Sequence, residues 1–451
     1  MILKTSWMAP KMNHLPRAII VFLLPFSILF RLKKSFLKMV LLFIGAVLCH
    51  GGRTVCGCLR AVGMQGEKAF ANYHHLLSRS KISMLQGSKE LIKMILPLTG
   101  VSVVFVIDEH LERRRGNKIK AKATYRDPVA SSKSRIIRAT GLKWMVLAIL
   151  VSFSWSKRSF ALPICCVLRK PENHPKNLKR KTRSGTDLIC QMLIVIRRWF
   201  PHLKITLLGD GDFARAKLCS LCQKLSIGLV SRMRADARLH DFVLPGKRKG
   251  RTPKVGKRLK KAEKSVWEKL QVQWYKGEFK EVLATARSCL WLAGRESAVI
   301  TLKAVWVQLR PEDEVILMTT DIEMDVATVI SLYVKRWNIE VTFREGRDYL
   351  GIETQREWSD LAIERSTPLL FMLYTLIVLI GNELNKTKAI VAESTAWYNK
   401  KHLTFSDLLQ AVKKEMGEVK APILNSLLNT ELGKIDPGEE LPGKCPTAMG
   451  F

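Results

Sequence analysis

One short segment, residues 333–347 (YVKRWNIEVTFREGR), places polar side chains at helical intervals. On a helix at about 100° per residue, an arc of about 80° would hold Tyr333, Arg336, Glu340, Arg344 and Arg347. Apolar residues flank this stripe on both sides, a pattern that predicts a buried helix. Glu340 then has two interpretations. It can pair with the arginines four residues away on either side, or it can bind a metal ion.

Two aspartates strengthen the metal interpretation. The apolar, β-branched run 101–108 ends on Asp108, and the strand candidate 204–210 ends on Asp210. Open α/β folds bind ligands at the carboxyl ends of their strands. Two aspartates and Glu340 meeting there would suit Mg²⁺, which prefers oxygen ligands and keeps several waters. Each aspartate also has a simpler interpretation, because aspartates commonly cap or turn the chain where a strand ends.

The chemistry of such a site would be phosphodiester cleavage. Two divalent ions roughly 3.5–4 Å apart can activate a water or a 3′-hydroxyl and stabilise the leaving oxygen. Cations also screen the charge of a phosphodiester, so the site need not be positive by itself. The pattern therefore predicts a metal-assisted nuclease site.

The elements that would position these residues follow from the hydrophobic pattern. Strands are predicted at 144–153, 161–168, 227–233 and 315–321, and helices at 186–200, 213–225 and 325–350. Strands that alternate with helices indicate an α/β core whose sheet is covered by helices. Residues 235–320 differ, because short alternating segments there predict antiparallel strands. We interpret them as a β-rich insertion into the α/β core.

The charge balance points to a polyanionic partner. The chain has 75 Lys and Arg against 39 Asp and Glu, a net charge of +36. A surplus of this size attracts polyanions, and nucleic acid is the expected one. An anionic membrane surface and a merely basic surface are the alternatives. Residues 245–264 carry ten Lys or Arg against one Glu, which predicts a phosphate-binding arm or a solvated charge run.

The cysteines and the apolar runs give little evidence for disulfide bonds, a zinc site or a membrane span. The ten cysteines form no convincing disulfide framework, and the single C-x-x-C of Cys219 and Cys222 is weak evidence for zinc. Reduced thiols in a cytoplasm are therefore expected. The apolar runs 18–30 and 369–381 are shorter than the ~20 residues that span a bilayer. We predict buried helices there and no membrane partner.

The stripe resembles the signature of bacterial insertion-sequence transposases of the DDE type. That signature is Tyr, two residues, Arg, three residues, Glu, six residues and Lys. Tyr333, Arg336, Glu340 and Arg347 stand at this spacing, with arginine in place of the final lysine. The replacement keeps the charge and changes the phosphate geometry.

Two further sequence segments contribute to the resemblance. The segment 107–121 resembles the one after the first catalytic aspartate, which implies Asp108, although the Asp and Thr that often follow in relatives are replaced by Glu109 and His110. The segment 207–214 resembles the D-x-x-[FY] word of the second aspartate, which implies Asp210 and an aromatic at position 213. Asp212, two residues on, is a rival. The long interval before Glu340 leaves room for the strand insertion that this family carries.

The resemblance implies an RNase H-like core and a cut-and-paste reaction. Asp108, Asp210 and Glu340 would be catalytic and would bind two Mg²⁺ ions, which Mn²⁺ can replace. Tyr333, Arg336 and Arg347 would contact DNA. The implied endonuclease reaction is hydrolysis at the ends of the element, followed by attack of the freed 3′-hydroxyl on target DNA. Some relatives excise through a DNA hairpin and hold a flipped base on an aromatic of the insertion; candidates here are Trp274, Trp291 and Trp306, for which core packing is the simpler role.

The expected organisation is an α/β fold with five parts. These are a helical N-terminal DNA-binding region (1–100), an RNase H-like core in two pieces (101–234 and 321–385), the β-rich insertion with its basic loop (235–320), and a helical C-terminal region and tail (386–451). We expect the partner to be double-stranded DNA, both at the transposon ends and at the target. We also expect a homodimer in the synaptic complex and a cytoplasmic, nucleoid-associated location. Two alternatives remain: a catalytically inactive, transposase-derived DNA-binding protein, and an RNase H-like nuclease.

Overall fold

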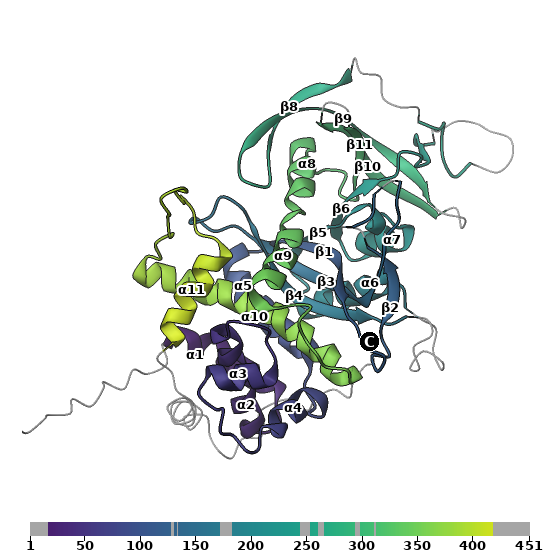
Figure 1. Cartoon of the computed structure of the whole chain (residues 1–451). Coiled ribbons are helices and arrows are strands. Elements are labelled where there is room, and N and C mark those ends of the chain that lie inside the picture. The colour runs from purple at the N-terminus through teal and green to yellow at the C-terminus, as the bar shows by residue number, and fades with distance from the viewer. Residues whose placement is uncertain are drawn as a thin grey trace, which may run out of the picture. The chain divides into compact units, whose positions relative to one another are not determined.

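The computed structural model describes residues 17–127, 130–132, 134–171, 183–243, 253–259, 266–293, 298–310 and 313–417. These form two compact units (Figure 1). The smaller contains 17–86, 354–356 and 376–417, and the larger contains the described residues of 87–353 and 357–375. Most of the predicted basic arm (its residues 245–252 and 260–264) and the predicted C-terminal tail after residue 417 lie outside the described residues.

The centre of the larger unit is a five-stranded sheet core. Its strands are, in spatial order, β4 (Phe160–Arg169), β3 (Arg138–Val151), β1 (Ser102–Arg113), β5 (Lys204–Leu208) and β6 (Ile227–Met233). The first three pair antiparallel, whereas β5 and β6 run parallel to β1. Three antiparallel strands followed by two parallel ones are the arrangement of an RNase H-like core. The predicted α/β fold class is therefore confirmed.

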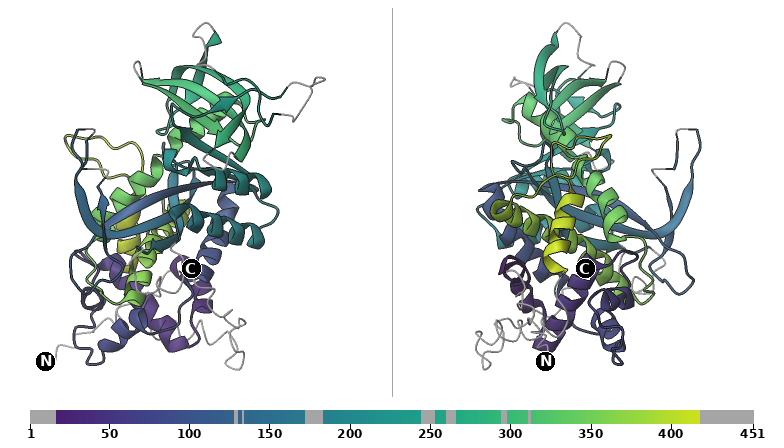
Figure 2. Two further views of the ribbon diagram at one scale, coloured as in Figure 1. Left: turned by 90° about the vertical axis from the view of Figure 1, so that its right-hand side faces the viewer. Right: turned by 60° about the vertical axis from the view of Figure 1, so that its left-hand side comes forward.

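The insertion continues the same sheet. β11 (Asp313–Thr319) pairs antiparallel with β6 and is followed by β10 (Ala298–Arg310) and β9 (Phe279–Ala293). Both β7 (Leu239–His240) and β8 (Glu268–Gln273) pair with β9. These strands, coloured teal to green in Figure 2, are the predicted β-rich insertion. The pattern missed β7 and also β2 (Ala123–Arg126), which pairs with β3, because strands this short show too little alternation to be recognised.

Helices cover both faces of the core sheet. The helices of this unit are α5 (Met84–Thr99, from residue 87), α6 (Gly185–Trp199), α7 (Ala216–Lys224), α8 (Val326–Lys335), α9 (Asn338–Leu350) and the first part of α10 (Asp360–Lys388). On β1, Glu109 approaches Gly185 at the start of α6, whereas the ring of its neighbour His110 lies 4.9 Å from that of Phe343 in α9. Because neighbouring side chains on a strand point to opposite faces, α6 and α9 lie on opposite sides of the sheet.

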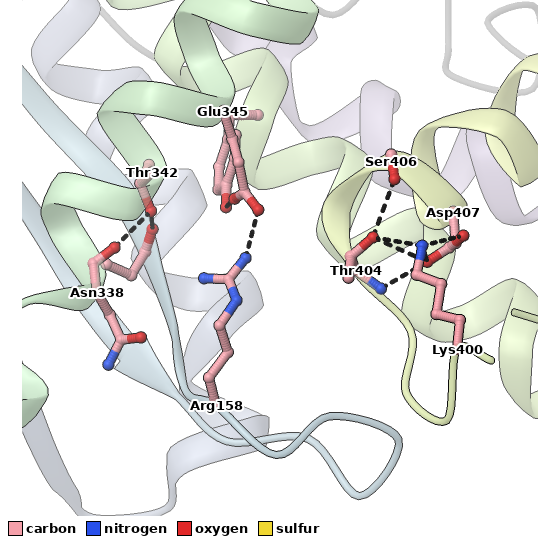
Figure 3. A network of polar contacts seen from close by, with 10 residues as sticks. Arg158, Asn338, Thr342, Glu345, Lys400, Thr404, Ser406 and Asp407 are labelled. Carbon is pink, nitrogen blue, oxygen red and sulfur yellow. Dashed lines mark hydrogen bonds and ion pairs between the residues drawn. The ribbon is translucent and has the colours of Figure 1, made fainter. Parts of the chain in front are cut away.

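The smaller unit is helical. It contains α1 (Arg17–Leu23), α2 (Lys33–Leu48), α3 (Val55–Ala61), α4 (Ala71–Ser78), the last part of α10 and α11 (Phe405–Met416). Thr404 and Asp407 form a capping box at the start of α11, and Lys400 pairs with Asp407 there (Figure 3). Helices are therefore present both before and after the core in the sequence, as expected.

Helix α10 has an unusually apolar sequence. Among the described residues it is the helix with the length and composition of a membrane span, at a mean hydropathy of 1.6. Within the protein, 83% of its apolar window is buried. A core helix gives the same composition, and the prediction of a buried helix at 369–381 is confirmed by this burial.

The predicted helix 325–350 is two helices, α8 and α9. Asp325 caps α8 by accepting a hydrogen bond from the backbone N–H of Thr328 at 2.8 Å. At the junction, the N–H of Trp337 donates to Val334 O (3.3 Å) and that of Glu340 to Trp337 O (3.1 Å). These three-residue hydrogen bonds tighten the turn. The backbone therefore remains helical along the stripe, but the α-helix is interrupted by a tighter turn just before Glu340.

Candidate active site

Asp108 and Asp210 stand at the same level on neighbouring strands. β1 and β5 run parallel, and their last paired residues are Val106 and Leu208. Each aspartate lies two residues further along its chain, and adjacent strands lie about 4.8 Å apart. The two carboxylates are therefore carried to the same edge of the sheet, as the sequence predicted for strand ends.

One detail of that prediction is wrong, because Asp108 does not end its strand. β1 continues to Arg113 and pairs with β3 along this stretch, with Asp108 opposite Val146. What ends near Asp108 is the parallel neighbour β5. The apolar run ends at Ile107, although β1 itself continues beyond it.

Asp210 is held by a tight turn. Its Oδ1 accepts a hydrogen bond from the backbone N–H of Asp212 at 2.9 Å, and its carbonyl accepts one from Ser231 Oγ at 2.5 Å. Phe213 is buried beneath this turn, against Gly209. The side chain of the rival Asp212 is 81% exposed. The turn thus orients Asp210 inward and leaves Asp212 in solvent.

Arg336 links the helix to the sheet. Its Nη1 lies 3.0 Å from Glu340 Oε1 and 3.6 Å from Asp108 Oδ2, and its side chain is only 13% exposed. The guanidinium also lies 5.8 Å from the centre of the Tyr333 ring. Arg336 therefore links Glu340 in α9 to Asp108 in the sheet.

The three carboxylates influence one another electrostatically. Burial raises the pKa of Asp108 to about 7, Arg336 opposes this rise, and Asp210 and Glu340 add to it. For Glu340, burial and, to a smaller extent, the nearby Asp210 raise the pKa, whereas Arg336 opposes this rise. For Asp210, burial is again the main cause of a raised pKa. Carboxylates that raise one another's pKa while sharing one cation form a single electrostatic site.

Glu109 and His110, which depart from the family pattern, have structural partners. Glu109 points to the sheet face opposite its neighbour Asp108 and pairs with Lys143 and with Arg169 (3.3 Å). The buried His110 ring packs against Phe343. Burial lowers the pKa of His110 to about 3, with a further lowering by nearby arginines. A neutral histidine packed on an aromatic ring stabilises the contact between β1 and α9.

Arg347 lies further along the stripe. Its side chain is 35% exposed, and Nη1 is 4.0 Å from Glu353 Oε1. Glu353 is also 3.6 Å from Arg113, the last residue of β1. Arg347 and Arg113 therefore share Glu353 as an acidic partner near the end of β1, and part of the Arg347 side chain remains exposed to solvent. Arg344 is exposed.

The expectation of a helix buried on both flanks is wrong for one flank. Ile339 and Phe343 are buried, whereas Val334 and Val341 are only half-buried. A helix packed on one face of a sheet can bury only the side that faces the strands. The stripe consequently lies along a half-open surface, which a polymeric substrate could reach.

A family model for DDE superfamily endonucleases matches residues 28–295. This match spans more than half of the chain and includes both aspartates. The chain belongs to this family. The matched range ends before α9 and so does not include Glu340.

Comparison with known structures adds little about the site. Seven solved chains match this DDE endonuclease. One is a piggyBac transposase in a synaptic complex with hairpin DNA, with 11% identity over 91% of this chain and 76% of that chain, at a TM-score of 0.41. A likeness at this level supports no comparison of residues. No curated protein matches the chain.

Enzymes of the DDE superfamily generally depend on divalent metal ions. Within the described residues of this endonuclease, no three His, Cys, Asp or Glu side chains are placed closely enough to hold an ion. The donor chemistry nevertheless fits, because three carboxylates supply the hard oxygens that Mg²⁺ prefers and Arg336 already places a cation beside two of them. Asp108, Asp210 and Glu340 are the residues that would hold the metal.

The other metal candidate does not fit. Cys219 and Cys222 are both buried in α7. Burial raises the pKa of the Cys219 thiol to about 12 and that of Cys222 further still. Within the described residues, no further cysteine, histidine or carboxylate joins the pair to complete a metal site. The pair is part of the hydrophobic core.

A buried polar network holds α9 on the sheet (Figure 3). Glu345 accepts hydrogen bonds from Arg158 (2.5 Å) and from the hydroxyl of Tyr374 (2.6 Å). Thr342 donates to the carbonyl of Ala161 in β4 at 2.8 Å. Sequence reasoning did not single out these residues, because their partners lie far away in the chain. These hydrogen bonds hold α9 in place and so help to position Glu340.

The tryptophans of the insertion occupy different settings. Trp306 is 5% exposed in β10 and belongs to the core. Trp291 and Trp274 are half-buried, and Lys280 Nζ lies 4.7 Å from the centre of the Trp274 ring. Core packing is thus the role of Trp306.

Proposed function

We propose that this DDE endonuclease is a cut-and-paste transposase of the insertion-sequence type, with Asp108, Asp210 and Glu340 as its catalytic carboxylates. One observation carries the proposal. Two aspartates stand at the same level on adjacent parallel strands, and Arg336, from far along the chain, contacts both Glu340 and Asp108.

The chemistry would be two successive displacements at phosphorus. Water attacks a phosphodiester at the element's end, the P–O3′ bond breaks, and a free 3′-hydroxyl and a 5′-phosphate result. That 3′-hydroxyl then attacks a target phosphodiester and displaces the target's 3′ oxygen, so one P–O bond replaces another. Bound Mg²⁺ or Mn²⁺, two ions in the expected form, would activate the attacking oxygen and stabilise the leaving one.

The protein's own contribution is positioning. Asp108 and Asp210 come from the rigid sheet, and Glu340 comes from a helix held by buried hydrogen bonds, so their relative places are set before substrate arrives. Partial burial strengthens every charge interaction at this site, because water screens it less.

DNA would lie along the stripe. The net charge of +36 and pI near 10.0 favour a polyanion. Tyr333, Arg336 and Arg347 would contact phosphates, and the N-terminal region 1–100 would help bind the ends of the element. Cleaving two ends in one complex calls for a homodimer.

The experiment is incubation of the purified chain with duplexes of the element's ends, a target plasmid and Mg²⁺. The ends are taken from inverted repeats that flank the coding sequence. We expect 3′-hydroxyl cleavage and then joined products. Binding without any strand cleavage would favour an inactive DNA-binding protein. Nicking without joining would instead favour an RNase H-like nuclease.

A further inference from the structure

Arg336 occupies the place that a metal ion would need. Its Nη1 contacts one oxygen of Glu340 at 3.0 Å and lies 3.6 Å from an oxygen of Asp108. These carboxylates come from two different elements, so Arg336 bridges the sheet and the helix. The same oxygens would ligate the divalent ion in the proposed function.

A guanidinium and a divalent ion cannot both hold these oxygens closely. Each carboxylate has a limited set of lone pairs, and two cations within about 4 Å of each other repel strongly at the low effective dielectric of a partly buried site. The pairing seen here is thus an alternative to metal binding. For the metal to enter, the Arg336 side chain must move away.

Arg336 is also poorly satisfied where it stands. Its Nε is buried and has no hydrogen-bond partner within the described part of the protein. Further along the helix from Arg336, the stripe is accessible to solvent, because Glu340 is 34% exposed and Arg344 is exposed. A phosphate on this surface would offer the guanidinium a bidentate, charge-assisted partner.

We propose that Arg336 is a built-in competitor of the catalytic metal, and that DNA raises metal affinity by drawing Arg336 onto a phosphate. This inference rests on the proposed function, because it takes Asp108 and Glu340 as metal ligands. Metal and DNA then bind with positive coupling, and by linkage each raises the affinity for the other by the same factor. The metal would be loaded preferentially where a substrate is already present.

The test is Mn²⁺ binding to the metal-free, DNA-free protein, measured by isothermal titration calorimetry. Arg336→Gln should bind Mn²⁺ about tenfold more tightly than wild type or better, because the competing charge is gone. Arg336→Lys, which keeps a charge without the planar fork, should fall between them. Arg344→Gln is the matched control, since it removes the same charge from an exposed position about two turns further on, and it should change affinity less than threefold.

A second measurement guards against variants that fold poorly. Mn²⁺ should raise the Tm of Arg336→Gln by more than it raises the Tm of wild type at the same metal concentration, since tighter binding to the folded state gives a larger shift. Equal affinities and equal Tm shifts for wild type and Arg336→Gln would overturn the inference.

Asp108→Asn separates this inference from the proposed function. If wild type binds Mn²⁺ and Asp108→Asn does not, the metal site stands, and the Arg336 variants alone decide the competition. If Asp108→Asn binds Mn²⁺ as well as wild type does, the assignment of the metal ligands has failed, and the inference fails with it.

Discussion

Replacing Glu345 by leucine should destabilise the protein strongly. Glu345 is 8% exposed and accepts hydrogen bonds from Arg158 at 2.5 Å and Tyr374 at 2.6 Å. Burial raises the pKa of Tyr374, and the Glu345 carboxylate raises it further, so this hydroxyl stays a donor. Glu345→Leu leaves both donors buried without their acceptor.

The magnitude follows from the burial of the pair. Breaking a buried ion pair by removing one partner lowers the free energy of unfolding by about 3–5 kcal/mol. At an m-value of about 3 kcal/mol/M, the urea midpoint should fall by about 1–2 M. Because α9 carries Glu340, DNA cleavage by the folded variant should fall as well.

The assay is urea unfolding followed by circular dichroism, with two companions. Arg158→Met combined with Glu345→Leu removes both charges and should recover most of the loss, since an apolar pair can replace a buried ion pair. Glu281→Gln is the control, because its pair with Lys269 is exposed, at 51% and 70%. An exposed pair contributes about 0–1 kcal/mol.

Two results would refute this reasoning. One is a Glu345→Leu midpoint as high as that of Glu281→Gln. The other is a double variant as unstable as Glu345→Leu alone, because the loss would then come from packing and not from the stranded Arg158 charge.

Three further predictions concern charge. Glu340→Gln should abolish cleavage while DNA binding, measured by gel shift, survives; normal cleavage would refute the catalytic assignment. Neutralising Lys and Arg in 247–261 should flatten the salt dependence of DNA binding by about 0.9 in slope per lost phosphate contact, and an unchanged slope would identify a solvated charge run. Burial raises the pKa of Asp108 to about 7 in the fold, above its unfolded value of about 4. The metal-free protein should therefore lose stability as pH rises from about 4 to 7, and Asp108→Asn should remove that loss in urea titrations at several pH values.

Much of the fold could be predicted because its elements have local signatures. The first half of β1 and the strands β4 and β5 are largely apolar runs, and α6 has a regular helical period. Such patterns depend only on which faces are buried. Short edge strands such as β2 and β7 carry no such pattern and were missed. The break at Trp337 was missed as well, because no proline or glycine marks it in the sequence.

The sequence by itself determined which residues could do chemistry: the spacing of Tyr333, Arg336, Glu340 and Arg347, and the aspartates beside two apolar runs. It could not decide what Arg336 contacts. The spacing of four residues permits its pair with Glu340, whereas its approach to Asp108 needs the packing of α8 and α9 on the sheet. Strand register likewise sets Asp108 level with Asp210. Tertiary structure alone decides such contacts, because they join groups that no local pattern relates.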